Sequence, residues 1–491
     1  MLSNYIILSF MLKDVVRNSC NMIKGLPTMN YLDKEMQNVW QKDKDHHIHP
    51  WTDFSSFNET GAMILSGGDK AHVTDGAGKR YLDGIGGLWC VNIGYGRQEI
   101  AQAMADQVMK IPYYSAFGHH TTQPAAELSA KLAELAPGDL NHVFYGCGGS
   151  VANDTAVRMV HFYFNQLGKP SKKKIISRID GYHGSTYMAM SITGVKFDHI
   201  GFDIEEELVH HISCPNPYRR PVEQSLEDFC DEKIQELEDK ILELGPDNVA
   251  MFFAEPIMGA GGVIVPPPGY HKRTLDVCHK YDILYISDEV VTAFGRLGHM
   301  FASEDEFGII PDIITCAKGL TSGYIPLGAT IISDRIYDVI NKPQAEGALF
   351  THGYTYSGHP VSCAVALKNI EILERENICD HVKEMGGYFE EQLHTLSDLS
   401  IVGDVRGKKF MICIENVANK ETKELIDNKA KVGNRIADYC EDKGLLVRPL
   451  AHMNILSPPL ILTKENIDFL VSTLRNAIES TISDLKEEGF L

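Results

Sequence analysis

The stretch Ile283-Leu284-Tyr285-Ile286-Ser287-Asp288-Glu289-Val290 sets an acid directly after a short apolar run. Such a run is typical of a strand that is buried on both faces, as in a parallel sheet. Lys318 follows a second apolar run, residues 313–315, and enters a glycine-containing turn. Because parallel strands bring their carboxyl ends to one edge of a sheet, Asp288 and Lys318 are expected to face each other. A lysine after a strand is usually only a solvated charge, so the pair needs support from elsewhere in the chain.

Short apolar runs alternate with helical patterns from about residue 140 to residue 335. The other four runs are residues 143–145, 174–177, 249–253 and 329–332. Six runs separated by helices predict an α/β fold with a doubly wound, mostly parallel sheet. Ligand sites in such sheets collect at the carboxyl ends of the strands, where Gly146, Glu255, Asp288 and Lys318 fall.

The pattern changes after about residue 350. Helical segments at residues 359–376 and 381–396 precede a strand region at residues 401–414, another helix and a final apolar stripe with helical spacing. We therefore expect a large domain over residues 96–345 and a smaller α+β domain that combines residues 30–95 with residues 346–491. Residues 1–29 are an extension that is a targeting segment, a disordered tail or an over-extended gene start; the short apolar run without a cleavage site favours the last.

Composition narrows the class of protein. The chain has 491 residues, of which 44% are hydrophobic and 23% charged, as in globular proteins with more than one structural unit. Its net charge of -20 disfavours nucleic acid or an anionic membrane as the main partner. Eleven scattered cysteines without a Cys-x-x-Cys pair predict reduced thiols and a cytoplasmic protein, and Cys147 alone lies beside a glycine-rich turn.

The segment His46-His47-Ile48-His49 has the residue type of a metal site. No cysteine or acidic cluster with matching spacing accompanies it in the sequence. The sequence therefore predicts no metal ion.

Residues 144–154 combine a strand end, the turn Gly146-Cys147-Gly148-Gly149 and the start of a helix. Small residues there let backbone N–H groups converge on an anion at a helix N-terminus, and a phosphate suits that position. The turn is neither a P-loop nor a dinucleotide fingerprint, which disfavours a dehydrogenase; a plain tight turn is the alternative. In Gly181-Tyr182-His183-Gly184, Tyr182 can lie flat on a planar ligand at the same edge, or pack against a helix start.

A phosphate cradle, an aromatic platform, a carboxylate and an amine together suit pyridoxal 5′-phosphate. At this point the chain resembles a class III aminotransferase of the fold-type I pyridoxal phosphate superfamily, and within it the omega-amino acid or amine:pyruvate branch. The shared motifs are HHIHPWTD (46–53), GLWCVNIGYG (87–96), GYHG (181–184), AEPI (254–257), DEV (288–290), AKGL (317–320) and TYSGHP (355–360). The resemblance implies a seven-stranded type of mixed, mostly parallel sheet.

The resemblance implies a role for each cofactor-binding residue. Lys318 would carry the cofactor as a Schiff base, Asp288 would pair with the pyridine nitrogen, and Tyr182 would stack on the ring. The remaining contacts would come from Val290 on the opposite ring face, the phosphate loop Gly148, Gly149, Ser150 and Val151, Thr355 of a neighbouring subunit, and Glu255 near the phenolic side. The loop departs from the family's usual Ser-Gly-Ser-Glu, and Met258 stands where glutamine is common, so only backbone phosphate contacts are expected from the loop.

For the substrate, the resemblance implies that Arg448 binds a keto-acid carboxylate, that Trp89 walls the pocket and that Phe117 reaches in from the partner. A site shared in this way requires a homodimer or a tetramer. The predicted function is transfer of an amino group from an omega-amino acid or terminal amine to pyruvate by a ping-pong mechanism. Beta-alanine, taurine, putrescine and aryl amines are the donors considered.

Several alternatives stay open at the level of sequence. The first is a class III aminotransferase that uses 2-oxoglutarate, and the second is an aminomutase of the same fold. A non-catalytic binding protein is disfavoured because Lys318, Asp288 and the phosphate loop occur together. A transcription regulator would need a helix-turn-helix module, for which about thirty spare N-terminal residues leave no room.

Overall fold

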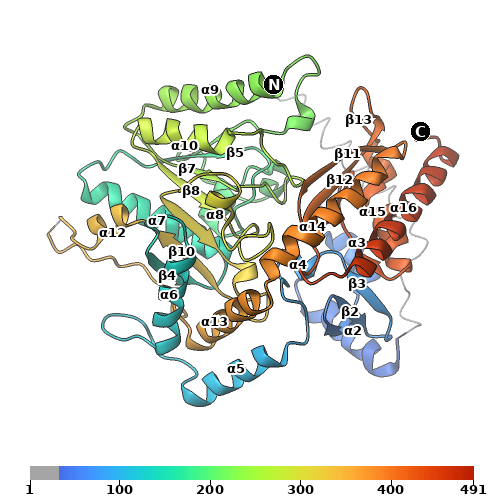
Figure 1. Ribbon diagram of the computed structural model, residues 1–491, viewed down its shortest axis with the longest axis horizontal. Helices are drawn as coiled ribbons and strands as arrows, with labels where there is room; N and C mark the ends of the chain where they lie inside the picture. Colours follow the sequence, from blue (N-terminus) through green and yellow to red (C-terminus); the bar gives the residue numbers. More distant parts are fainter. Residues whose placement is uncertain (1–31, 345) are drawn as a thin grey trace.

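A seven-stranded sheet forms the centre of the protein, whose computed structural model describes residues 32–344 and 346–491 (Figure 1). The predicted extension, residues 1–29, lies outside the described residues. In spatial order the strands are β4 (His142–Gly146), β10 (Gly328–Ile332), β9 (Ile313–Cys316), β8 (Leu284–Asp288), β7 (Val249–Ala254), β5 (Lys174–Arg178) and β6 (Val209–Ile212). Strand β10 runs antiparallel to both of its neighbours, and all other pairs are parallel.

This sheet confirms the predicted mixed, mostly parallel α/β architecture. All six apolar runs found in the sequence are strands. The seventh strand, β6, was missed because its sequence is Val209-His210-His211-Ile212, which is not an apolar run. It lies at the sheet edge, where it pairs only with β5, and its two histidines are half-buried.

Helices cover both faces of the sheet, and the strands alternate their side chains between two cores. On one face Phe253 of β7 packs with residues of α7 (Gly149–Gln166), whereas Phe252 packs on the other face with residues of α9 (Leu226–Leu244) and α10 (Tyr270–Lys280). Since both faces are buried, the strands read as continuous apolar runs in the sequence. Helix α13 (Pro360–Arg375) packs against α5 (Gln98–Lys110) and α6 (Gln123–Leu135).

The first described segments of the chain and its C-terminal segments lie together beside this sheet, blue against orange and red in Figure 1. Strand β14 pairs in parallel with β3, so residues near 445 extend a sheet begun near residue 65. That sheet consists of β1 (Leu65–Asp69), β2 (His72–Asp75), β3 (Arg80–Asp83) and β14 (Leu445–Leu446). A five-stranded sheet follows, with β11 (Val402–Lys408), β12 (Met411–Asn419), β13 (Glu424–Leu425), β15 (Arg448–Leu450) and β16 (Met453–Leu456).

Three helices complete this C-terminal part: α14 (Ile378–His394), α15 (Val432–Asp442) and α16 (Lys464–Glu487), which carries the predicted apolar stripe on its buried side. The exact domain limits stay a prediction. Among the described residues, no helix has the length and apolar character needed to cross a membrane.

Arg296 joins several of these segments from within the core. It is fully buried and donates hydrogen bonds to the carbonyls of Phe410 (3.1 Å) and Pro458 (2.5 Å) and to the side-chain oxygen of Asn92 (2.9 Å). No carboxylate among the described residues forms an ion pair with it, and burial lowers the pKa of its guanidinium to about 10. Its role is therefore to supply donors to buried acceptors that have no access to water.

We expect Arg296→Met to lower the free energy of unfolding by roughly 3 kcal/mol, because up to three buried acceptors lose their donor. Urea unfolding monitored by circular dichroism measures this change. Arg375→Met is the matched control, since Arg375 is a surface residue paired with Glu99 and its loss should have little effect. Equal effects of the two substitutions would contradict the linking role of Arg296.

Candidate active site

Lys318 and Asp288 lie on neighbouring strand ends, as the sequence predicts. Asp288 ends β8 opposite Thr315 of β9, and Lys318 begins a 3-10 turn, η5 (Lys318–Leu320), just beyond β9. Burial lowers the pKa of Lys318, whereas the charges of Asp288 and Glu255 raise it and that of Arg448 lowers it. Within the part of the chain that the structure describes, the Lys318 amine has no hydrogen bond or ion pair. It is therefore a half-buried amine without a structural partner.

The backbone at Lys318 is held in an uncommon conformation. Its φ is 41°, in the left-handed region that non-glycine residues seldom occupy. At the next residue, Gly319, a Cβ would lie 2.4 Å from the Nδ2 atom of Asn92, so only glycine fits. Asn92 itself donates to the carbonyl of Phe294 (2.7 Å) and accepts from Arg296. The Arg296 network thus fixes the chain direction on which Lys318 depends.

Asp288 is buried and is held by three donors. Its Oδ2 accepts hydrogen bonds from Nδ2 of Asn153 and from Nδ1 of His183, both at 2.8 Å, and its Oδ1 accepts from the Val290 amide at 3.1 Å. Asn153 is in turn fixed, because its Oδ1 accepts from the Thr315 hydroxyl at 2.7 Å. The carboxylate therefore has a fixed position and orientation.

The sequence alone predicts no role for Asn153 and only a position for His183. A polar residue on the mostly apolar buried face of α7 is the available signal for Asn153, which is fully buried. An unpaired buried amide is costly, so such a residue needs a partner in the fold. Which partner it has is a property of the tertiary structure.

Tyr182 is presented by a turn that Glu255 holds. One carboxylate oxygen of Glu255 accepts from the Tyr182 amide (3.0 Å) and the other from the Gly259 amide (2.9 Å). Burial raises the pKa of Glu255. The Tyr182 ring also makes an edge contact with Trp51 at a centroid distance of 5.8 Å. Nothing in the sequence beyond the motif of residues 46–53 predicts this contact.

The glycine-rich turn surrounds the start of α7 closely. Gly148 is the N-cap residue, and no side chain caps the helix, so the first-turn amides of residues 149–151 lack an intrahelical acceptor. A Cβ at Gly149 would lie 2.9 Å from the side chain of Val290. The Ser150 hydroxyl accepts from the Ser185 amide at 3.1 Å. These groups form a small cradle at a positive helix end, which suits an anion.

Arg448 begins β15 and its guanidinium is partly buried. Burial lowers its pKa, and nearby Tyr182 and Asp198 raise it. Asp198 belongs to a 3-10 turn, η3 (Lys196–His199), and burial raises its pKa to about 6. Among the described residues the Arg448 guanidinium forms no hydrogen bond or ion pair, so this cation, like the Lys318 amine, has no fixed partner.

Three further predicted residues lie around this group without direct contacts that define a role. Trp89 is buried in a cluster with Ile257 and Met411. Phe117 is 57% exposed, and Thr355 is exposed, with its carbonyl accepting from the Tyr113 hydroxyl at 2.7 Å. Their parts in a pocket or a shared site stay predictions.

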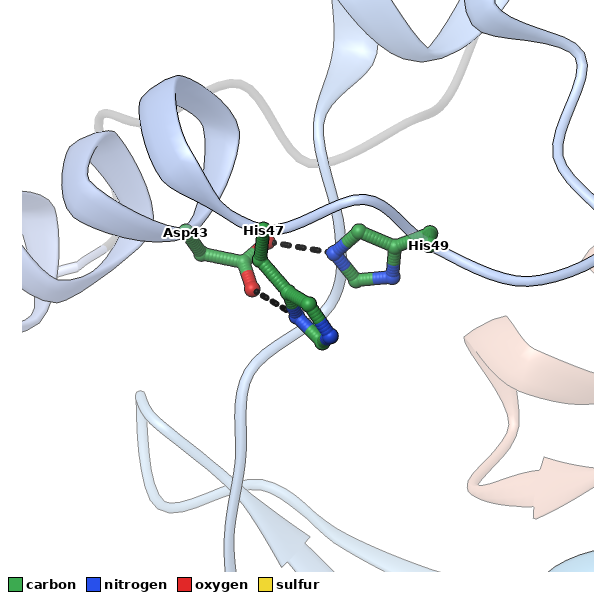
Figure 2. Close-up of side chains that lie close together, drawn as sticks. All are labelled: Asp43, His47 and His49. Carbon is green, nitrogen blue, oxygen red and sulfur yellow. Dashed lines mark hydrogen bonds and ion pairs between the residues drawn. The ribbon is translucent and has the colours of Figure 1, made fainter.

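One cluster in the described residues could hold a metal ion. It consists of Asp43, His47 and His49 (Figure 2). The sequence prediction considered only cysteines and acidic clusters as partners of these histidines, whereas α2 (Lys34–His46) places a single acid, Asp43, one helical turn before His47. Helical spacing, rather than adjacency, was the signal that the sequence offered.

The sequence profile of the class-III aminotransferases matches residues 57–478. The chain is 43% identical over 444 residues to the putrescine–pyruvate aminotransferase of Pseudomonas aeruginosa, covering 90% of this chain and 96% of that protein. It is 39% identical over 456 residues to the diaminobutyrate–2-oxoglutarate transaminase of Halomonas elongata, covering 91% and 97%. The solved omega transaminase of Pseudomonas jessenii in complex with PMP superposes with a TM-score of 0.88 at 38% identity, covering 91% of this chain and 98% of that chain.

A substitution at Gly184 tests the close contact between the turn that carries Tyr182 and the start of α7. Its φ is 139°, and a Cβ there would lie 2.3 Å from Oγ of Ser150. We expect Gly184→Ala to lower the free energy of unfolding by roughly 2 kcal/mol, because of backbone strain and the displaced serine. Gly148→Ala is the control, since a Cβ at Gly148 meets no atom within 4 Å. Chemical unfolding should separate the two variants, and an unchanged midpoint for Gly184→Ala would refute the contact.

Proposed function

Because the chain belongs to the class-III aminotransferases, we propose that it uses pyridoxal 5′-phosphate to move an amino group from a terminal amine or omega-amino acid to pyruvate. The observation that carries the proposal is the unpartnered Lys318 amine beside an Asp288 carboxylate that three donors hold in place. An aminotransferase also requires an amine donor and a keto-acid acceptor.

The residues present fit this cofactor. The open N-terminus of α7, with its glycine cradle, suits the phosphate, and Tyr182 and Val290 offer surfaces for the two ring faces. When bound, pyridoxal phosphate supplies a reactive carbonyl carbon and an electron-withdrawing ring that stabilises negative charge on the substrate carbon. The departure from the usual loop sequence leaves this fit intact, because the helix N-terminus binds through backbone amides.

Asp288 has the task of holding a proton on the pyridine nitrogen. A fixed carboxylate next to that nitrogen favours its charged form, as opposite charges within a few ångströms do. Asn153 and His183 keep Oδ2 in place, so Oδ1, which accepts only from the Val290 amide, is the oxygen with capacity left. Because buried neighbours already orient the Asp288 carboxylate, no free energy is spent on reorganising it during the reaction.

Lys318 has two tasks that both require an amine which can lose its proton. Burial lowers its pKa, which increases the fraction of neutral amine available to hold the cofactor. As a free amine, Lys318 would be placed to remove and return the proton of the substrate carbon that bears the amino group.

Arg448 is proposed to bind the acceptor. A planar guanidinium without a fixed partner can bind a carboxylate through two parallel hydrogen bonds. Pyruvate as the acceptor is supported by the relative from P. aeruginosa, whereas the relative from H. elongata is named for 2-oxoglutarate. The choice between these acceptors is therefore the first quantity to measure.

We further propose a homodimer with shared active sites. The exposed apolar side chains of Leu88, Tyr114, Phe117 and Tyr356 occur in segments near the predicted pocket residues Trp89 and Thr355. Exposed large apolar and aromatic side chains such as these suit a protein interface. Phe117 and Thr355 would then act in the partner's site rather than in their own.

The proposal is tested by incubating the purified enzyme with a panel of donors and either pyruvate or 2-oxoglutarate. The donors are putrescine, beta-alanine, taurine and an aryl amine, and the products to be measured are alanine and glutamate. Alanine formation that depends on donor and is absent in Lys318→Ala supports the proposal. If glutamate is the only amino acid formed, the acceptor is 2-oxoglutarate and not pyruvate. If the donor is isomerised and neither amino acid forms, the enzyme is an aminomutase.

Asp288→Asn should keep the cofactor but lower kcat by about 10- to 1,000-fold. The amide cannot hold the ring proton, and a close opposite charge is typically worth about 1 to 3 pKa units, each equal to a factor of ten. Absorbance of the bound cofactor checks retention, and steady-state kinetics measures the loss. Turnover close to that of the native enzyme would rule out this role for Asp288.

Arg448→Ala should raise the KM for pyruvate by about 10-fold or more and change the KM for a neutral amine far less. The physical reason is that only the keto acid carries a carboxylate, and a charge-assisted bidentate contact is worth about 1.5 to 3 kcal/mol. Arg435→Ala is the control, since Arg435 pairs with Glu488 away from these residues. A similar rise for both substrates would argue against carboxylate binding by Arg448.

A further inference from the structure

Asp43, His47 and His49 bring two imidazole nitrogens against one carboxylate (Figure 2). Nδ1 of His47 lies 3.0 Å from Oδ1 of Asp43, and Nε2 of His49 lies 2.8 Å from Oδ2. Asp43 belongs to the last turn of α2, His47 is its C-cap residue, and His49 lies in the segment that follows. The cluster is outside the group of residues around Lys318, and the aminotransferase reaction uses none of it.

We propose that these three residues form a binding site for a divalent transition-metal ion of the Zn²⁺ type. Two imidazoles and a carboxylate are the donor set that Zn²⁺, Cu²⁺ and Ni²⁺ prefer, and three protein ligands leave a position for water. The three donor atoms lie within 4.8 Å of one another. Since donors around a four-coordinate zinc ion are roughly 3.3 Å apart, small side-chain shifts suffice to enclose the ion.

The surrounding structure holds the ligands close to this arrangement before an ion binds. The His47 amide donates to the Asp43 carbonyl at 2.9 Å, which fixes the end of the helix. The His49 ring packs against His47 (4.4 Å between centroids) and against Phe57 (4.5 Å), which belongs to α3 (Phe54–Thr60). Packing of this kind restricts ring rotation and lowers the entropy lost on binding.

The composition of the cluster also suits a cation. Oδ1 and Oδ2 of Asp43 face one imidazole nitrogen each, so one carboxylate and two imidazoles make up the donor set. Each imidazole now faces the carboxylate with the nitrogen that the ion would take. Binding therefore replaces two N–H···O contacts by bonds to the metal, and any proton on those nitrogens moves to the other ring nitrogen or to solvent.

The ion would connect α2 to the edge of the active site. Trp51, just beyond His49, has a φ of 56°, an uncommon left-handed conformation for a bulky residue. Its ring contacts the ring of Tyr182 at 5.8 Å. An ion that fixes His49 restricts the segment that carries Trp51, and thereby the wall next to Tyr182.

The test is a Zn²⁺ titration of the metal-stripped holoenzyme by calorimetry, together with amide hydrogen exchange of residues 46–54. We expect one ion per chain, slower exchange in that segment, and an affinity that falls by at least about tenfold in Asp43→Ala, His47→Ala and His49→Ala. His46→Ala and Asp45→Ala are the matched controls, because both side chains are exposed neighbours outside the cluster and should keep native affinity.

The cysteines are identical in every variant, so any Zn²⁺ that they bind does not change the differences between variants. The His47 side chain is exposed, so we expect the His47→Ala variant to fold normally. Thermal unfolding without metal checks this. The proposal is overturned if the native protein takes up no Zn²⁺ at micromolar concentration. It is equally overturned if affinity and exchange in the Asp43→Ala, His47→Ala and His49→Ala variants are the same as in the native protein. Because neither readout is transaminase activity, failure here leaves the proposed function untouched.

Discussion

A buried carboxylate that needs hydrogen-bond donors on both oxygens is the constraint on which the site depends. Asp288 meets it by accepting from Asn153, His183 and the Val290 amide, and these donors come from a helix, a turn and the strand's own extension. The order β9-β8-β7-β5 of the sheet is what brings those three elements to one edge. Without that order the charge would be unpaired in a low-dielectric interior, at a cost of several kcal/mol.

Other charged side chains near the site have hydrogen-bond partners within the fold, in contrast to Lys318 and Arg448. Glu289, next to Asp288, is fully buried and accepts from Thr292, the Ala302 amide and both donors of Ser303, so it stabilises a loop. Lys172 is also buried, and its amine donates to three backbone carbonyls. Lys318 and Arg448 have no such partners among the described residues. Cations that a fold buries without satisfying them are candidates for ligand contact.

The Arg296 network links this site to the C-terminal part of the chain. Arg296 donates hydrogen bonds to the carbonyls of Phe410 and Pro458 and to the side chain of Asn92. The Asn92 side chain in turn packs closely against Gly319, the residue that follows Lys318. Arg448 arrives from the same C-terminal part, on β15. The position of the amine therefore depends on segments that are more than a hundred residues apart in the chain.

The sequence by itself determined the sheet, the strand ends that carry Asp288 and Lys318, and the glycine turn before α7, because these rest on local periodicity and turn chemistry. It did not reveal the edge strand β6, because two histidines interrupt the apolar run by which the other strands are recognised. It also did not reveal that Asp43 is the partner of His47. Asn153, Asp198 and the contact of Trp51 with Tyr182 were decided only by the tertiary structure. The physical reason is that a polar side chain's partner depends on which distant segment packs against it, and no spacing along the chain encodes that choice.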